Sequence, residues 1–488
     1  MLRSHSTCLR VRSDRRSLPL PPVLVVASSA MSALERHFQI RERGSTVRTE
    51  VLGGVVTFLT MAYIVVVNPA ILSAADMPVE AVTVATALGA AVFTLAMGLA
   101  TNLPFAIAAG LGINAVVAFQ IVGGEGVPWQ VAMACIVIEG VLAIVLVLAG
   151  LREAIMRAVP HEIKLSIGVG IGLFITLVGL RDAGITVNSP ATGIELGDIT
   201  AGPPLVALAG LLTMIVLAAR NVKGSLLIGI AVSTVVGLVF GVLEGPDSIA
   251  RLPQGDDFST IGDALAPDNL LDALTWALVP LIFVLFVTDF FDTIGTAVAV
   301  SSAGNLLDEN GQPPRLKRLL LVDSVAAAGG GVLGTSSNTT YVESGAGVAE
   351  GARTGLASVV TAGCFLLTIF LVPLITVVAQ TVLIGPEGAQ QETHPAVAPA
   401  LIMIGFLMIR LVADIDWSRP EAAIPAFFVI AGVPLTFSIA AGIGLGILSY
   451  VLVMAGTGRA SRVHPLMWAL VPLFLAFFAS DWLSANVF

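Results

Sequence analysis

Acidic residues inside apolar stretches are the candidates for chemistry in this 488-residue sequence. Asp289 and Asp292 share one stretch, and their spacing of three places them on one broad face of a helix. Glu343 lies in a short glycine-rich stretch, and Glu139 and Asp323 lie in two others. No Lys or Arg lies in the interior of these stretches, so each carboxyl group must be protonated, hydrogen-bonded or in contact with water. Such groups are candidates for binding a polar ligand or carrying a proton.

Hydroxyl groups surround the two strongest candidates, Asp292 and Glu343. Thr293 and Thr296 follow Asp292 within one helical turn, and Thr340 precedes Glu343 by three residues. A carboxylate in apolar surroundings needs such donors. For both acids we favour a role in substrate or proton binding over a purely structural hydrogen bond.

The other polar positions are more ambiguous. For Asp289, a functional and a structural role are equally supported. For Glu139 and Asp323, we favour a carboxyl that bridges two helices through hydroxyl groups. Asn114, in the segment Gly110-Leu-Gly-Ile-Asn114, either caps the backbone or contacts a ligand.

The stretches that hold these residues are membrane-spanning segments by length and composition. The sequence is 56% hydrophobic and only 12% charged, half the charge usual for a soluble domain. Solid apolar blocks of about 20 residues predict an all-α integral membrane protein and exclude a soluble enzyme and a barrel. The predicted blocks are 50–73, 80–100, 104–122, 128–150, 161–180, 203–220, 224–244, 270–303, 317–334, 338–352, 355–379, 396–413, 421–435, 437–456 and 464–483.

The third and tenth of these blocks are short, rich in glycine and partly polar. If seven blocks make one half of the molecule, these two occupy equivalent positions in halves of opposite orientation. Paired broken segments of this kind indicate an inverted-repeat transporter whose binding site lies near the bilayer midplane. The alternative is ordinary close packing of helices through small residues.

Basic residues sort to one side of the predicted membrane. Of the 24 Lys and Arg residues, five lie in residues 1–30, seventeen lie on one set of segment ends, and only Arg181 and Arg251 lie on the other. The positive-inside rule then predicts a cytoplasmic N-terminus in a multi-pass inner-membrane protein. Residues 1–30 superficially resemble a signal peptide, but their apolar run is short and contains prolines, so we expect the chain to start functionally at Met31 and residues 1–30 to be disordered.

Several functional classes find no support in the sequence. The net charge is −9 and no basic patch with interleaved aromatic residues appears, which argues against nucleic-acid binding. The three cysteines and five histidines are scattered, so we expect no metal cofactor and no disulfide framework. No Ser-His or His-Glu constellation suggests a membrane-embedded enzyme.

The longest motifs resemble the AzgA-like purine permeases, the guanine/hypoxanthine/adenine branch of the nucleobase:cation symporters within the xanthine/uracil permease superfamily. The resemblance covers residues from about 32 to 456 and beyond, nearly the whole chain outside residues 1–30. It rests on Thr57-Phe-Leu-Thr-Met-Ala-Tyr-Ile64 with Asn68-Pro69, Gly110-Leu-Gly-Ile-Asn114, Phe291-Asp-Thr-Ile-Gly-Thr296, Pro314-Arg-Leu-Lys-Arg318, Thr339-Thr-Tyr-Val-Glu343 and Gly347-Val-Ala-Glu-Gly351.

The resemblance implies fourteen transmembrane segments in two inverted repeats of seven, usually in a homodimer. A core domain would comprise residues 31–150 and 269–380, and a gate domain residues 151–268 and 381–458. Residues 459–488, which hold the surplus apolar block, would form a C-terminal hydrophobic appendage.

The resemblance also implies proton-coupled uptake of a purine base, with no cofactor beyond the proton. By motif matching, the carboxylates of the eighth and tenth segments are Asp292 and Glu343, and the polar position of the third is Asn114. We expect the two carboxylates to hold opposite edges of the base, with backbone donors near Val342 and a ring face from Phe290. The expected supporting residues are Asp289, Thr293, Thr296, Thr340 and Gly112.

Two alternatives share this architecture. One is a xanthine/urate or uracil permease of the sibling branch: the motif Asp292-Thr-Ile-Gly-Thr296 favours the purine branch, but one side chain can move a pocket between bases. An anion exchanger is disfavoured, because two acids would face the anion with no compensating base.

Overall fold

The computed structural model describes residues 35–150, 159–189, 192–275, 278–307, 312–385 and 390–479, apart from the side chain of Phe291. Residues 1–30, predicted to be disordered, lie outside this described part. Within it, eight helices are long and apolar enough to cross a membrane, and four shorter apolar helices accompany them. The prediction of a helical multi-span membrane protein is confirmed.

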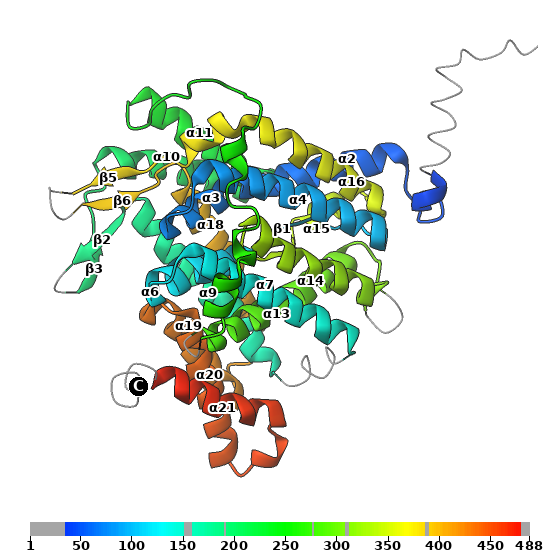
Figure 1. Ribbon diagram of the computed structural model, residues 1–488, viewed down its shortest axis with the longest axis vertical. Coiled ribbons are helices and arrows are strands. Elements are labelled where there is room, and N and C mark those ends of the chain that lie inside the picture. Colours follow the sequence, from blue (N-terminus) through cyan, green and yellow to red (C-terminus); the bar gives the residue numbers. More distant parts are fainter. Residues whose placement is uncertain are drawn as a thin grey trace, which may run out of the picture.

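One group of elements, which we call the strand-bearing bundle, packs around two short paired strands at its centre (Figure 1). It consists of α2 (Val47–Met61), α3 (Ile64–Leu72), α4 (Val79–Thr101), β1 (Ile107–Ala109), α5 (Leu111–Ala115), the π-helical η2 (Val116–Val122), α7 (Trp129–Leu148), α13 (Val279–Ala303), α14 (Leu316–Leu333), β4 (Asn338–Thr340), α15 (Ser344–Ala349), α16 (Gly355–Thr368) and α17 (Val372–Val378).

A second group, the peripheral bundle, packs mainly within itself. It consists of α9 (His161–Asp182), α10 (Gly202–Ala219), α11 (Ser225–Val239), α18 (Ala398–Ile409), α19 (Pro420–Thr436) and α20 (Ile439–Gly456). The remaining short elements are η1 (Ser73–Ala75), α6 (Gly123–Glu125), β2 (Thr186–Ser189), β3 (Gly193–Leu196), η3 (Gly255–Phe258), η4 (Asp263–Leu265), α12 (Pro267–Asp272), η5 (Ile369–Leu371), β5 (Val382–Ile384), β6 (Gln391–Thr393), η6 (Arg410–Asp414) and η7 (Ala460–Arg462).

The third and tenth predicted blocks meet inside the strand-bearing bundle. β1 and β4 pair antiparallel, with Ala108 opposite Thr339, and each strand leads into a short helix. The Thr94 hydroxyl bonds both backbone groups of Ile107, donating to its carbonyl at 3.0 Å and accepting from its N–H at 2.9 Å. Irregular backbone at membrane depth is tolerated only when protein satisfies it, and the ladder and Thr94 do so here.

Small residues let the long helices of the strand-bearing bundle lie unusually close. A Cβ atom built on Gly140 of α7 would lie 2.3 Å from the backbone nitrogen of Ala328 in α14. A Cβ built on Gly355 of α16 would lie 2.0 Å from the carbonyl oxygen of Gly98 in α4. α4, α16, α14 and α7 accordingly run side by side across the right half of Figure 1. This packing without large side chains is typical of helix association in membranes.

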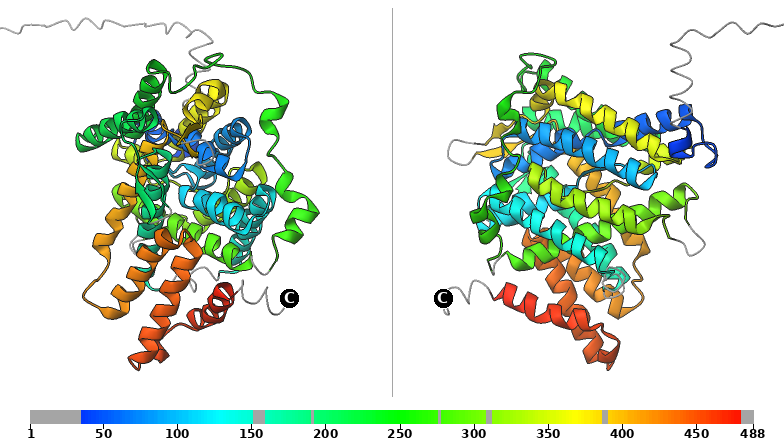
Figure 2. Two further views of the ribbon diagram at one scale, coloured as in Figure 1. Left: turned by 90° about the vertical axis from the view of Figure 1, so that its left-hand side faces the viewer. Right: turned by 45° about the vertical axis from the view of Figure 1, so that its right-hand side comes forward.

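The C-terminal apolar block forms α21 (Pro465–Phe478), shorter than the predicted 464–483. It packs on α20, where Phe474 is fully buried and lies against Gly444. Figure 2 shows it running along the outside of the two bundles. The predicted block 270–303 is also divided in the structure, because α12 ends at Asp272 and α13 begins only at Val279.

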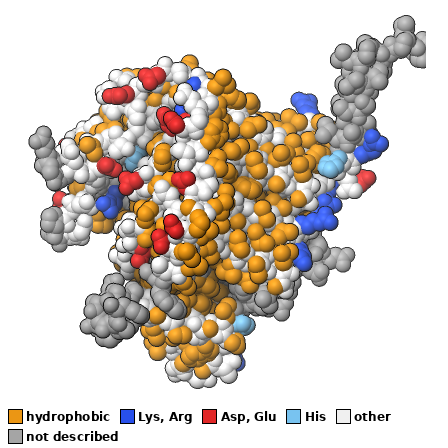
Figure 3. All heavy atoms as spheres, in the orientation of Figure 1, with side chains coloured by type: hydrophobic (Ala, Val, Ile, Leu, Met, Phe, Trp, Pro, Cys, Tyr) orange, Lys and Arg blue, Asp and Glu red, His pale blue; other side chains and the backbone are white. Residues whose placement is uncertain are grey.

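Charged side chains lie on two opposite faces. Figure 3 shows acids on the left, most Lys and Arg at the right-hand edge, and a broad hydrophobic surface between them. We call these the acidic face (hairpins β2–β3 and β5–β6 and the loop 245–266) and the basic face (residues 35–46 and the Arg315 end of α14). Exposed side chains such as Leu99, Leu212 and Leu367 form the band between them, as expected of a lipid-facing belt.

Arg251, one of two basic residues on the acidic face, anchors its longest loop. Its guanidinium donates to both carboxylate oxygens of Asp257, at 2.5 and 2.7 Å, and to Glu80 at 3.2 Å. These hydrogen bonds hold the pKa of Asp257 below its usual value despite its burial.

Candidate functional site

Asp292 and Glu343 are the two accessible acids in the centre of the strand-bearing bundle. Asp292, in α13, is exposed, and Glu343, the N-cap of α15, is half-buried. The helices that carry them, α13 and α15, pack against each other. Val342, next to Glu343, is 58% exposed, so the backbone at the start of α15 also faces open space. The structure therefore brings the two predicted carboxylates and the Val342 backbone to one accessible site.

Tyr63 completes the surroundings of Glu343. Its hydroxyl, at the junction of α2 and α3, donates to Glu343 Oε1 at 2.5 Å, and the ring is almost fully buried. A carboxylate that accepts this bond keeps one side-chain orientation while its remaining lone pairs stay available. Sequence reasoning did not assign Tyr63 a role, although it lies in the motif Thr57–Ile64 and is one of only three tyrosines.

Asp323, in α14, joins the elements that carry the site. Its carboxylate accepts from the Thr293 hydroxyl at 2.6 Å, the Thr340 hydroxyl at 2.8 Å and the Thr340 N–H at 3.0 Å. The Thr293 hydroxyl also lies 2.9 Å from that of Thr339. Asp323 thus connects α13, α14 and β4, and the predicted supporting residues Thr293 and Thr340 bind it. This is the arrangement of a structural carboxyl.

The other buried acids lie deeper than Asp292. Asp289 is 2% exposed and accepts a hydrogen bond from Ser337 at 3.2 Å. Glu139, in α7, is fully buried, and neither of its oxygens has a hydrogen-bond partner within the described part of the chain. Thr296 is 7% exposed and lies one turn beyond Asp292. None of the three reaches the accessible space around Asp292 and Glu343.

Asn114 belongs to a buried amide network rather than to the accessible surface. Its amide donates to Asn68 Oδ1 at 2.5 Å, and Asn68 donates in turn to the Thr86 hydroxyl at 2.8 Å and to the Thr335 carbonyl at 3.3 Å. Asn114 Oδ1 is buried without a hydrogen-bond partner among the described residues. The network ties α5 to α3, α4 and the segment before β4. Asn68 lies in one of the motifs quoted above, but the sequence assigned it no role.

The last two predicted residues are packed away from open space. Phe290 is 4% exposed and lies against Phe286, with ring centroids 5.5 Å apart. Gly112 faces the peripheral bundle, where a Cβ atom would lie 3.0 Å from a methyl group of Ile171 in α9. Across the described ranges, no three His, Cys, Asp or Glu side chains are grouped as metal ligands.

The sequence matches a known protein family. The profile of the Permease family (Xan_ur_permease) matches residues 48–445. The chain belongs to this permease family. It is a transporter, not an enzyme, and this confirms the resemblance found in the motifs.

Relatives that match this chain over nearly their whole length are named as permeases. The guanine/hypoxanthine permease PbuG of Bacillus subtilis is 40% identical over 460 residues, covering 91% of this chain and 99% of the relative. The putative permease MJ0326 of Methanocaldococcus jannaschii is 39% identical, covering 91% and 98%. The adenine permease AdeP of Escherichia coli is 37% identical, covering 92% and 96%.

Solved structures share the fold at low identity. The transmembrane domain of the cyanobacterial bicarbonate transporter BicA matches with a TM-score of 0.57 at 16% identity, covering 81% of this chain and 97% of that one. The murine anion transporter Slc26a9, in an inward-facing state, matches with a TM-score of 0.57 at 11% identity, covering 93% and 77%. These matches show that the chain shares the fold of these two transporters.

Proposed function

We propose that this permease imports purine nucleobases, namely guanine, hypoxanthine, adenine or several of these, together with protons. The observation that carries the proposal is the pair of accessible carboxylates, Asp292 and Glu343, on elements that converge at the β1–β4 ladder. The names of the relatives PbuG and AdeP support the same substrate class.

The chemistry of the site suits a purine edge. A carboxylate accepts two parallel N–H bonds from guanine, which is a strong charge-assisted geometry. Glu343 donates no hydrogen bond when ionised, and Tyr63 occupies only one of its acceptor positions, so both oxygens still have lone pairs for the base. Asp292 would hold the opposite polar edge, and the backbone at Val342 would meet a carbonyl group.

Proton binding to Asp292 would couple transport to the proton gradient. Protonation removes one of two negative charges from the site, so the loaded strand-bearing bundle could move past the peripheral bundle at lower electrostatic cost. No cofactor is needed beyond the proton. An anion substrate is disfavoured, because two carboxylates would repel it.

The proposed topology has fourteen segments in two inverted repeats, with α2–α7 and α13–α17 as the core and the peripheral bundle as the gate. The pairing of β1 with β4 supports this assignment, because it joins the two broken segments expected at equivalent positions. We further propose a homodimer in the plasma membrane with its N-terminus in the cytoplasm. The separate basic and acidic faces support the orientation.

Competition of labelled hypoxanthine uptake by adenine, guanine, xanthine and uracil, with and without an uncoupler, tests the substrate class and the coupling. Inhibition by purines and loss of uptake with the uncoupler are expected. Stronger inhibition by xanthine or uracil than by the other bases would assign the chain to the sibling branch.

Two substitutions test the site itself. Asp292→Asn and Glu343→Gln should abolish uptake while membrane insertion stays intact. Asp247→Asn, at an exposed loop of the acidic face, is the matched control and should retain uptake. Near-normal uptake by either site variant would disprove the assignment.

A further inference from the structure

A side chain of the strand-bearing bundle caps a helix of the peripheral bundle. Gln120, in η2, is 7% exposed, and its Oε1 accepts from the backbone N–H groups of Ile439 at 3.1 Å and Ala440 at 3.3 Å. These are the first two N–H groups of α20, which have no acceptor within their own helix. The Ser438 hydroxyl accepts the third, from Ala441. The two bundles are therefore joined by hydrogen bonds that exist only while they lie together here.

Three phenylalanine rings meet beside this cap. Phe119 of η2 lies 5.9 Å from Phe174 of α9 and 6.1 Å from Phe437, and the last two lie 4.9 Å apart, all edge to face. The Arg181 guanidinium lies 5.5 Å from the Phe437 ring centroid. Phe437 itself has φ +53°, which is uncommon for a side chain of this size and marks a conformation held by its surroundings.

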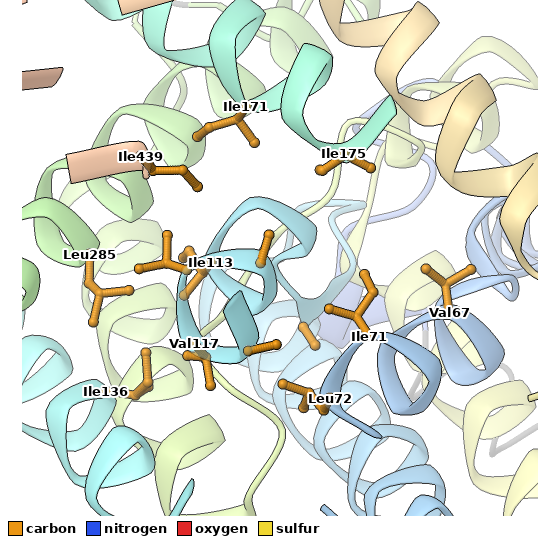
Figure 4. Close-up of a cluster of buried hydrophobic side chains, with 14 of the residues drawn as sticks. Val67, Ile71, Leu72, Ile113, Val117, Ile136, Ile171, Ile175, Leu285 and Ile439 are labelled. Atoms are coloured by element: carbon orange, nitrogen blue, oxygen red, sulfur yellow. The ribbon is translucent and has the colours of Figure 1, made fainter. Parts of the chain in front are cut away.

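The elements that carry the rings also contribute to an apolar layer between the bundles. Figure 4 shows Ile171, Ile175 and Ile439 of the peripheral bundle facing Ile113 and Val117 of α5 and η2. Each of these five side chains is at most 2% exposed. The contact between the bundles is therefore closed to water on the side of the acidic face, where α9 ends and α20 begins.

Exposed positions continue from the site in the opposite direction. Along α13, exposed positions recur from Asp292 through Gly295 and Ala299 to Ser302, a helical stripe that ends at the basic face. A Cβ atom built on Gly295 would meet nothing within 4 Å. By contrast, α13 is largely buried from Leu281 to Phe290.

We propose that Gln120, Phe119, Phe174 and Phe437 form a gate that closes the path between the acidic face and the Asp292–Glu343 site. In the structure this gate is closed, and the exposed stripe of α13 leads from the site toward the basic face. η2 is a π-helical turn, a distortion often found at functional sites, and it presents Phe119 and Gln120 to the peripheral bundle together. The gate depends on the proposed function only in requiring a transport path.

Thiol labelling from each side of the membrane tests the gate without any substrate. The parent carries Val342→Cys as reporter, with the three native cysteines replaced. A membrane-impermeant thiol reagent is added to intact cells or to inside-out vesicles. We expect fast labelling from the basic face and slow labelling from the acidic face, because Val342 is exposed but the gate is closed.

Substitutions in the gate should change only the labelling rate of Val342→Cys from the acidic face. In Gln120→Ala, the N–H groups of Ile439 and Ala440 lose their acceptor, so labelling from the acidic face should rise about fivefold or more. Phe119→Ala should also raise the labelling rate from the acidic face, and it replaces Gln120→Ala as the test variant if Gln120→Ala inserts poorly into the membrane. Gln120→Glu should keep this labelling slow, because a carboxylate accepts both N–H groups and is favoured at a helix N-terminus.

Gln391→Ala is the matched control. Gln391 likewise bonds two backbone groups near the acidic face, donating to the carbonyls of Arg181 and Thr186, but it joins only parts attached to the peripheral bundle. This substitution should leave both rates unchanged. Equal rates from the two faces in the parent, or no change in Gln120→Ala and Phe119→Ala, would overturn the gate. An equal rise in Gln391→Ala would also overturn it. If the proposed purine substrate were wrong, the uptake assays would show it, and the labelling rates would not change.

Discussion

Removing a single hydroxyl group tests whether Tyr63 orients Glu343, the carboxylate proposed to bind the substrate. Tyr63→Phe keeps the buried ring in place and deletes only the donor 2.5 Å from Glu343 Oε1. A hydrogen bond to a charged group contributes about 1.5–3 kcal/mol. Glu343 is half-buried, so water partly replaces the lost donor, and the lower end of that range applies. A loss of about 1.5 kcal/mol corresponds to roughly tenfold weaker binding.

Labelled hypoxanthine uptake over a range of concentrations measures this effect. We expect KM to rise about tenfold, with a smaller change in the maximal rate, because Glu343 itself remains. Tyr450→Phe in α20 is the matched control, since it removes the same hydroxyl group from a half-buried position in the peripheral bundle. A KM within twofold of the parent in Tyr63→Phe would refute the orienting role. A lower KM would show that Tyr63 competes with the base.

Two further predictions concern stability, measured by thermal unfolding in detergent. Gly140→Ala should destabilise the folded protein by about 2 kcal/mol or more, because the new Cβ would overlap the backbone of Ala328. The control Gly363→Ala, with open space around it, should be neutral or stabilising. Equal effects of the two substitutions would contradict the close contact of α7 and α14. Asp257→Asn should lower the unfolding temperature at pH 7, since Arg251 lowers the pKa of Asp257 in the folded state. That contribution is fully present above the unfolded pKa of about 3.9 and is lost as pH falls through the lower folded value, so the gap between variant and parent should close in acid; a gap independent of pH would exclude this ion pair as its cause.

The membrane class and the two broken segments could be predicted because they depend on local composition. Runs of apolar residues and clusters of glycine are visible in any window of the sequence. Asp292 and Glu343 could be found for the same reason, since a carboxylate in an apolar stretch is conspicuous alone. The resemblance of the longer motifs to known permeases also predicted the protein family.

The partners of those residues could not be predicted, because they come together only in the fold. Tyr63 and Glu343 are 280 residues apart, and Gln120 and Ile439 are 319 apart. Thr293 and Thr340 were expected to support the carboxylates of the site directly, but they bind Asp323 instead. Nothing in the local pattern distinguishes a hydroxyl group beside one acid from a hydroxyl group beside another.

The β1–β4 ladder also bears on how the specificity of this transporter could change. Its strands are joined by backbone groups, and Tyr341 N–H donates to the Ala106 carbonyl at 2.9 Å at one end while Gly110 N–H donates to the Ser337 carbonyl at 2.8 Å at the other. Bonds between backbone groups place few demands on side-chain identity. The ladder can therefore keep its shape when side chains around the candidate site change. Under the proposed function, a change of preferred base then requires a few local substitutions rather than a rebuilt fold.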